Sequence, residues 1–240
     1  MLTSSFIRKL EQYDRLSEAE RQVLESAVVR QRTVGRGEDM IREGDRPTES
    51  TVLIEGFAGR YNVLRNGKRQ ITALHVPGDF TDLHSFLLKT MDHSVLAITP
   101  CTIGMVPHET LHDIFENHPH LARLLAVSLA VDAAIHRHWM VAVGRRSALE
   151  HAAHLLCALF VRLQVVGLTE GYRFRLPLTQ AELGDTLGLS AVHVNRVVQD
   201  LRKENLITWR GEMVTIEDWP RLQQLADFDP TFLSLQNEPR

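Results

Sequence analysis

A short segment in the C-terminal quarter of the chain carries side chains that could read DNA bases. Arg196 can form a bidentate pair with guanine O6 and N7 or brace a phosphate, and Asn195 can bond adenine. His193 can donate a hydrogen bond to a base edge or to a phosphate. Ala191 and Val192 have no hydrogen-bonding side chain, but each can pack on a thymine methyl group. Such contacts require one helix that presents these side chains together.

The spacing of small and apolar residues predicts a helix-turn-helix that would present them. Leu183 and Leu187 lie on one face of a first helix that begins near Thr179. Gly184 is small where the second helix must approach closely, and Gly188 permits a positive φ at the turn. The second helix of such a unit enters the major groove.

The second helix and the segment after it complete the predicted unit. Ser190 is its expected N-cap. Its apolar face, at three- and four-residue spacing, consists of Val194, Val197, Val198 and Leu201. Two short β-runs then flank Arg210, Gly211 and Glu212, which predicts a hairpin wing. A wing directly after a helix-turn-helix is more specific than either part alone; the alternative is a three-helix packing unit that does not bind nucleic acid.

The charge of the chain does not by itself indicate a polyanion partner. Its 240 residues have a formal net charge of −3 at pH 7. Acidic residues slightly outnumber basic ones within residues 178–216. Contact with double-stranded DNA must therefore come from basic residues placed at the phosphates, and we expect moderate, salt-sensitive affinity.

The segment from residue 27 to 106 contains many short β-rich runs separated by turn formers. Such closely spaced strands predict a sandwich, barrel or roll. The Asn66-Gly67 pair suits a tight hairpin, because both residues tolerate positive φ. Helical patterns dominate the rest of the chain. We therefore expect an α+β fold that begins with a jelly-roll-like β-roll.

One long helix is predicted over residues 118–143, with a central stretch that lacks charged side chains. One side can lie on the β-domain, and a second copy of the chain is the simplest cover for the other side. A core helix within one domain is the alternative. Gly144 can end this helix, and Ser147 with Glu150 forms a capping box that starts the next one.

Three segments resemble the Crp/Fnr family of bacterial transcription regulators. The strongest is LTQAELGDTLGLSAVHVNRVV at 178–198, with weaker support from GEDMIREGD at 37–45 and VPGDF at 76–80. The order of parts is also similar to that of the family. The resemblance implies a cyclic-nucleotide-binding-like β-roll sensor domain at 1–117, a dimerisation helix at 118–145 and a winged helix-turn-helix DNA-binding domain at 146–240.

This resemblance implies a sequence-specific regulator that binds an inverted-repeat operator as a homodimer, with RNA polymerase as a further partner. Thr179 and Gln180 match positions where the family contacts phosphates, and Arg196 matches a recognition-helix arginine. Family members commonly place an Arg or Val and then a Glu after the N-cap, where this chain has Ala191 and Val192. Its operator should therefore differ. The alternative is a ligand-binding or protein-interaction module whose winged helix does not bind DNA.

The expected sensor pocket lacks the residues that hold a cyclic nucleotide in the family. The ribose-binding Gly-Glu pair is replaced by Asp82-Leu83, and the phosphate-binding Arg-Ser pair by His93-Ser94. Binding of cAMP is not expected, because the bidentate charge is missing and Asp82 would repel the phosphate. The candidate residues for an unknown effector are Asp82, His84, His93 and Ser94. The alternative is a degenerate pocket in a β-roll that serves only as a scaffold.

No cofactor, metal site or catalytic centre is expected from the sequence. Cys101 and Cys157 are far apart, so reduced thiols are a simpler expectation than a disulfide, and the family's cluster-binding N-terminal cysteines are absent. The pair His151 and His154 has no third metal ligand close in sequence. No nucleophile–base motif indicates an enzyme. Without a signal peptide or a long uninterrupted apolar stretch, we expect a cytoplasmic protein that does not enter the membrane.

Overall fold

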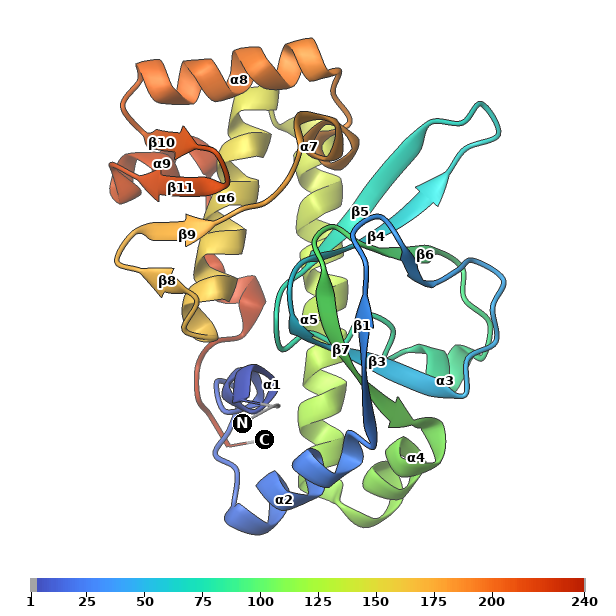
Figure 1. Ribbon diagram of the computed structural model, residues 1–240. Coiled ribbons are helices and arrows are strands. Elements are labelled where there is room, and N and C mark those ends of the chain that lie inside the picture. Colours follow the sequence, from blue (N-terminus) through green and yellow to red (C-terminus); the bar gives the residue numbers. More distant parts are fainter. Residues whose placement is uncertain (1–3, 240) are drawn as a thin grey trace.

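The computed structural model describes residues 4–239 and has the predicted α+β architecture (Figure 1). A β-roll is joined by one long helix to a smaller C-terminal domain. The helices are α1 Ser4–Leu10, α2 Glu18–Ala27, α3 Ser85–Leu88, α4 His108–Asn117, α5 Pro119–Arg145, α6 Ala148–Val165, α7 Gln180–Leu187, α8 Ala191–Lys203, α9 Trp219–Ala226 and the 3-10 helix η1 Pro230–Leu233. The strands are β1 Arg30–Val34, β2 Asp39–Ile41, β3 Glu49–Glu55, β4 Ala58–Val63, β5 Arg69–His75, β6 Ser94–Ala97, β7 Cys101–Pro107, β8 Thr169–Glu170, β9 Arg173–Arg175, β10 Ile207–Arg210 and β11 Met213–Ile216.

The β-roll consists of two antiparallel sheets with strand orders β1-β7-β3 and β2-β6-β4-β5. Its inner side chains include Leu53, Val95 and Ile103, none of which is exposed. Burial does not alternate strictly along the strands: four consecutive residues of β3, Ser50–Leu53, are buried. The segment GEDMIREGD at 37–45 contains the short strand β2.

The hairpin between β4 and β5 forms where Asn66-Gly67 predicted it, but its geometry differs. Only Gly67 has a positive φ, of 80°. The backbone N–H of Leu64 donates to the carbonyl of Lys68, and the Asn66 side-chain oxygen accepts from the Lys68 N–H at 3.1 Å. Asn66 therefore caps the turn with its side chain instead of adopting the positive φ that we expected.

Helix α5 is a single helix of 27 residues and is about 40 Å long. Its N-terminal half is buried through Leu121, Leu124 and Leu125. Toward its C-terminal end, Met140 and Val143 are exposed by 74% and 58%. The apolar residues of α5 are therefore buried in its N-terminal half and include exposed side chains near its C-terminal end.

The prediction that Gly144 ends α5 was wrong. The helix continues through Gly144 to Arg145, and the chain turns where Arg146 adopts an extended conformation. The predicted capping box then starts α6, because the Ser147 hydroxyl accepts from the Glu150 N–H and the Glu150 carboxylate accepts from the Ser147 N–H. Gly144 does not adopt the positive φ of a glycine that ends a helix, so the helix runs through it.

The C-terminal domain is built around α6, which packs against α8 and α9. Among the described helices, α6 is the one long and apolar enough to cross a bilayer by length and composition, yet 61% of it is buried inside the domain. Sequence patterns indicated a two-stranded wing, whereas the structure has a four-stranded sheet in the order β10-β11-β9-β8. The extra strands are only two and three residues long, so their pattern was too short to recognise.

The helix-turn-helix has the predicted turn at Gly188 and the predicted cap Ser190. Thr179 and Glu182 form a capping box at the start of α7, and Gly188 has a φ of 70° at its end. A Cβ atom added to Gly184 would lie 2.7 Å from the carbonyl oxygen of Leu189, in the turn. Gly184 therefore permits the close approach of the turn to α7.

We predict that Gly184→Ala lowers the free energy of unfolding by about 1–3 kcal/mol, because the added methyl group meets backbone that cannot rotate away. Gly144→Ala is the matched control, since it lies in a helix with open space around its Cβ position. That change should stabilise the protein by up to about 1 kcal/mol. Chemical denaturation of both variants measures the difference, and equal effects would contradict the packing role of Gly184.

Candidate nucleic-acid interface and the buried junction behind it

Helix α8 forms one end of the molecule, with one face packed inward and the other exposed (Figure 1). Val194, Val197 and Leu201 are buried against the domain. The predicted reading residues Ala191, His193, Asn195 and Arg196 are all exposed, as is Val192. Within residues 4–239, we find no hydrogen bond or ion pair for the side chains of His193, Asn195 and Arg196, which leaves them available to a ligand.

The start of α8 is fixed by its cap. The Ser190 hydroxyl accepts from the His193 N–H at 3.3 Å, so Ser190 has a structural role in the free protein. Thr179 is likewise engaged, because its hydroxyl donates to the Glu182 carboxylate at 2.8 Å. Both residues are exposed, and the N–H groups in the first turn of a helix lack intrahelical partners and can bind a phosphate.

Gln180 and Asn195 line one hollow between the start of α7, helix α8 and the wing. Arg202 and Trp209 also line it, and neither was selected from the sequence. The Arg202 guanidinium donates to the carbonyl oxygen of Trp209, which attaches the wing to α8. Arg202 lies in the last turn of α8 among polar residues. The sequence therefore did not distinguish it from side chains that only face solvent. Arg210 is exposed next to the wing turn.

The structure brings only two of the four candidate effector residues into contact. The rings of His84 and His93 lie with their centroids 5.1 Å apart. Asp82 is fully buried and accepts from the Thr51 N–H at 2.6 Å, while burial raises the pKa of its carboxyl to about 7. Ser94 accepts from the Glu43 N–H at 3.0 Å. Asp82 and Ser94 thus support the backbone of the β-roll.

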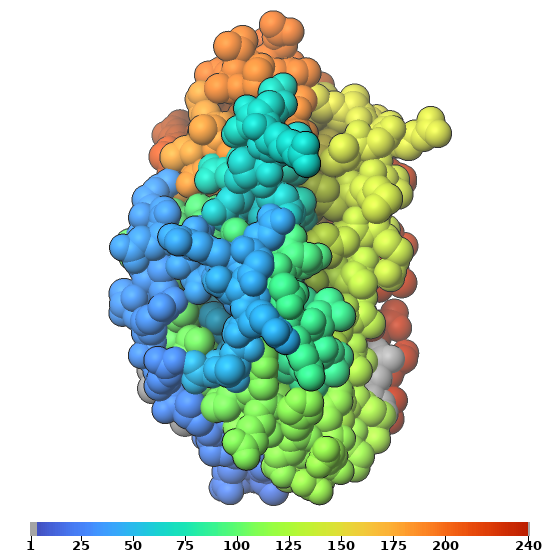
Figure 2. All heavy atoms as spheres, turned by 90° about the vertical axis from the view of Figure 1, so that its right-hand side faces the viewer, coloured from blue at the N-terminus to red at the C-terminus, as the bar shows by residue number. Residues whose placement is uncertain are grey.

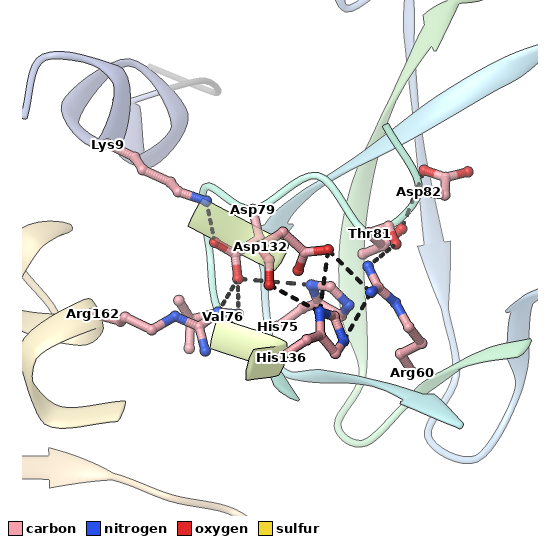
Figure 3. A network of polar contacts seen from close by, with 10 residues as sticks. All are labelled: Lys9, Arg60, His75, Val76, Asp79, Thr81, Asp82, Asp132, His136 and Arg162. Atoms are coloured by element: carbon pink, nitrogen blue, oxygen red, sulfur yellow. Dashed lines mark hydrogen bonds and ion pairs between the residues drawn. The ribbon is translucent and has the colours of Figure 1, made fainter. Parts of the chain in front are cut away.

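Behind the interface, a buried carboxylate joins the two domains (Figure 3). Asp79, in the VPGDF segment, lies 2.7 Å from Lys9 Nζ of α1 and 2.5 Å from Arg162 Nη2 of α6. It also accepts from the Val76 N–H at 2.9 Å. Burial alone would raise the pKa of the Asp79 carboxyl, but the charges of Lys9 and Arg162 outweigh burial and hold it well below its usual range.

A second ion pair connects the β-roll to the long helix. Arg60 of β4 donates to the Asp132 carboxylate of α5 at 3.1 Å and to the carbonyl oxygen of Thr81 at 3.2 Å. His136 Nε2 lies 3.2 Å from the same guanidinium (Figure 3). Nearby His75 is neutral, because burial, followed by the charge of Arg60, lowers its pKa to about 3.

The β-roll also contacts the first helix of the helix-turn-helix. Arg69 of β5 lies 2.7 Å from the Asp185 carboxylate, and Arg36 lies 3.1 Å from that of Glu182. The Gln70 amide donates to the carbonyl oxygen of Thr186 at 3.2 Å. The β4–β5 hairpin therefore lies beside α7 and near α8, as both views show (Figures 1 and 2). Sequence patterns gave no sign of these contacts, because their partners are more than a hundred residues apart.

A β-roll, a long helix and a winged helix-turn-helix with an exposed recognition face define a DNA-binding regulator with a sensor-type domain. Residues 31–118 match the cyclic nucleotide-binding domain family, and residues 150–225 match the Crp-like helix-turn-helix domain family. The chain therefore belongs to the Crp/Fnr family of transcription regulators.

Individual relatives agree with this assignment. The chain is 30% identical to the transcriptional activator protein FnrL of Cereibacter sphaeroides, over 82% of this chain and 81% of that protein. It is 28% identical to the transcriptional activator protein anr of Pseudomonas aeruginosa, over 85% and 83%. The structure of FixK2 from Bradyrhizobium japonicum has the same fold, with a TM-score of 0.75 at 23% identity over 82% of this chain and 96% of that one.

We predict that Asp79→Asn destabilises the protein by about 3 kcal/mol or more, because two cations then lose their buried partner. Asp200→Asn is the control, since Asp200 pairs with Lys203 on the surface and should change stability by less than about 1 kcal/mol. Urea denaturation at pH 7 measures both variants. Equal stabilities for the two would contradict the junction.

The same carboxylate should make stability sensitive to acid. The folded-state pKa of Asp79 lies below its ordinary 3.8, so its contribution is complete above that value and is lost as pH falls through the lower folded pKa. The stability difference between the wild type and Asp79→Asn should therefore be constant from pH 7 to about pH 5 and shrink at more acidic pH. A difference that stayed constant at pH 3 and below would show that Asp79 is not the titrating group.

Proposed function

We propose that this Crp/Fnr-family regulator binds an inverted-repeat operator in double-stranded DNA as a homodimer. The observation that carries the proposal is the exposed, unpartnered set His193, Asn195 and Arg196 at the start of α8. These side chains lie on the helix that a helix-turn-helix inserts into the major groove. Ala191 and Val192 are exposed and would pack on thymine methyl groups, where relatives commonly place a Glu that can bond a base.

The dimer is supported by the outward side of α5. Met140, Val141 and Val143 are exposed by 74%, 52% and 58%, which is unusual for apolar side chains on a regular helix. Figure 2 shows α5 along one edge of the molecular surface, where a second α5 can pack against it. A two-fold axis along these helices would place two recognition helices about 34 Å apart, one turn of DNA.

Phosphate contacts would come from Thr179, Gln180 and the N–H groups at the start of α7, with Arg210 of the wing reaching the neighbouring backbone. Ser190 would contribute through its backbone, since its hydroxyl caps α8. In our proposal the protein works in the cytoplasm, where it meets RNA polymerase. The relatives named transcriptional activators support that role.

A signal would act through the β-roll. Arg36 and Arg69 form ion pairs with α7, so a change in the β-roll would shift the position of the helix-turn-helix. The replacement of the cyclic-phosphate arginine by His93 makes cAMP a poor candidate for the effector. A complete lack of salt-dependent duplex binding would instead favour a winged helix that contacts protein.

We predict that Arg196→Ala weakens binding to an operator selected from random duplexes by roughly 10- to 100-fold per half-site, because a bidentate base contact is lost. Arg15→Ala is the matched control, since Arg15 is an exposed arginine in the loop at the opposite end of the molecule. Fluorescence anisotropy at fixed salt measures both variants. Unchanged affinity for Arg196→Ala would mean that α8 is not the recognition helix.

A further inference from the structure

Three side chains of the β-roll converge beside α3 in an arrangement that sequence spacing did not reveal. His84 comes directly before α3, and Asp92 and His93 come directly before β6. One possible ligand atom from each residue lies within 4.8 Å of those of the other two. In a tetrahedral site with metal–ligand bonds of about 2.0–2.1 Å, neighbouring ligand atoms are about 3.4 Å apart. The limit of 4.8 Å exceeds this spacing, so the side chains would have to move toward one another to hold an ion.

His93 has the hydrogen bonding of a metal-binding histidine. Its ring is 95% buried, and its Nδ1 donates to the Asp92 carboxylate at 2.6 Å. With the proton fixed on Nδ1, Nε2 carries a free lone pair, and this atom is buried without a hydrogen-bond partner. Metal-bound histidines are commonly oriented by a carboxylate on the other ring nitrogen in this way.

His84 presents a second nitrogen of the same kind. Its Nε2 is also buried without a hydrogen-bond partner, and its ring is tilted by 46° against that of His93. Burial lowers the pKa of both rings, that of His93 to about 4. Both imidazoles are therefore neutral at pH 7, which is the form that binds a metal.

We propose that His84, His93 and Asp92 form a binding site for a divalent transition metal of the zinc, cobalt or nickel type. Imidazole nitrogens suit these ions, whereas magnesium and calcium prefer sites made only of oxygen. The two Nε2 atoms are the protein ligands, and Asp92 is the positioning residue for His93, because its carboxylate bonds the Nδ1 side of the ring. Water would complete the coordination of the ion.

The positive charge nearest to the site does not prevent metal binding. After burial, the charge of Arg60 is the next cause that lowers the pKa of both histidines. Its guanidinium is, however, paired with Asp132 at 3.1 Å and donates to the Thr81 carbonyl oxygen. The carboxylate of Asp92 adds a negative charge on the opposite, exposed side of His93.

The test is a titration of untagged, full-length protein with Co²⁺ and Zn²⁺ after dialysis against a chelator. We expect one equivalent of Co²⁺ per chain, with the visible absorption of a low-coordinate site, and displacement of Co²⁺ by Zn²⁺. His84→Gln and His93→Gln should each weaken binding at least about 10-fold, and Asp92→Asn about 10- to 100-fold. His118→Gln is the control, because His118 is half-exposed between α4 and α5, outside the cluster, and its replacement should leave binding unchanged.

Circular dichroism and thermal unfolding verify that each variant is folded. His84 is only partly buried, so His84→Gln still decides the matter if His93→Gln fails to fold. A lack of stoichiometric binding, or binding that His84→Gln leaves unchanged, overturns the proposal. The titration contains no DNA, so its outcome is independent of whether the protein binds an operator.

Discussion

The buried carboxylate of Asp79 is the constraint on which the arrangement of the two domains depends. A carboxylate with 4% of its side chain exposed is stable in its charged form only if cations come to it, and Lys9 of α1 and Arg162 of α6 do so. These partners belong to three separate parts of the chain. Because each part carries a charge that the others neutralise, this buried network holds the N-terminal helix, the β-roll and the DNA-binding domain together.

The rest of the interface between the domains follows from that arrangement. Once α6 is held against the VPGDF turn, the β4–β5 hairpin lies beside α7, and Arg69 reaches Asp185. Glu182 completes the capping box of α7 and also forms an ion pair with Arg36 of the β-roll. The β-roll therefore contacts the same end of α7 that would bind a phosphate. The outward face of α8 remains free. The geometry thus combines an exposed reading surface with a first helix whose position the sensor-type domain influences.

Local chemistry explains what could be predicted from the sequence. Caps, turn glycines and helical spacing act over a few residues, so the helix-turn-helix, its cap Ser190 and the capping box of α6 were all recognised. The β8 and β9 strands are too short to show a period, and Gly144 was misjudged because glycine is also tolerated inside a helix. The Asp79 junction joins distant segments, and no spacing rule reports such contacts. His84 and His93 were selected as candidates for one pocket, but the bond of His93 to Asp92 was not expected.

The central claim is that two copies of α8 read a two-fold symmetric site. Selection of bound sequences from a random duplex pool by the full-length protein tests it most directly. The account predicts enrichment of an inverted repeat whose half-sites are centred about 10 base pairs apart, the separation of two recognition helices on one face of DNA. Enrichment of a single unrepeated half-site, or no enrichment at any salt concentration, would contradict it.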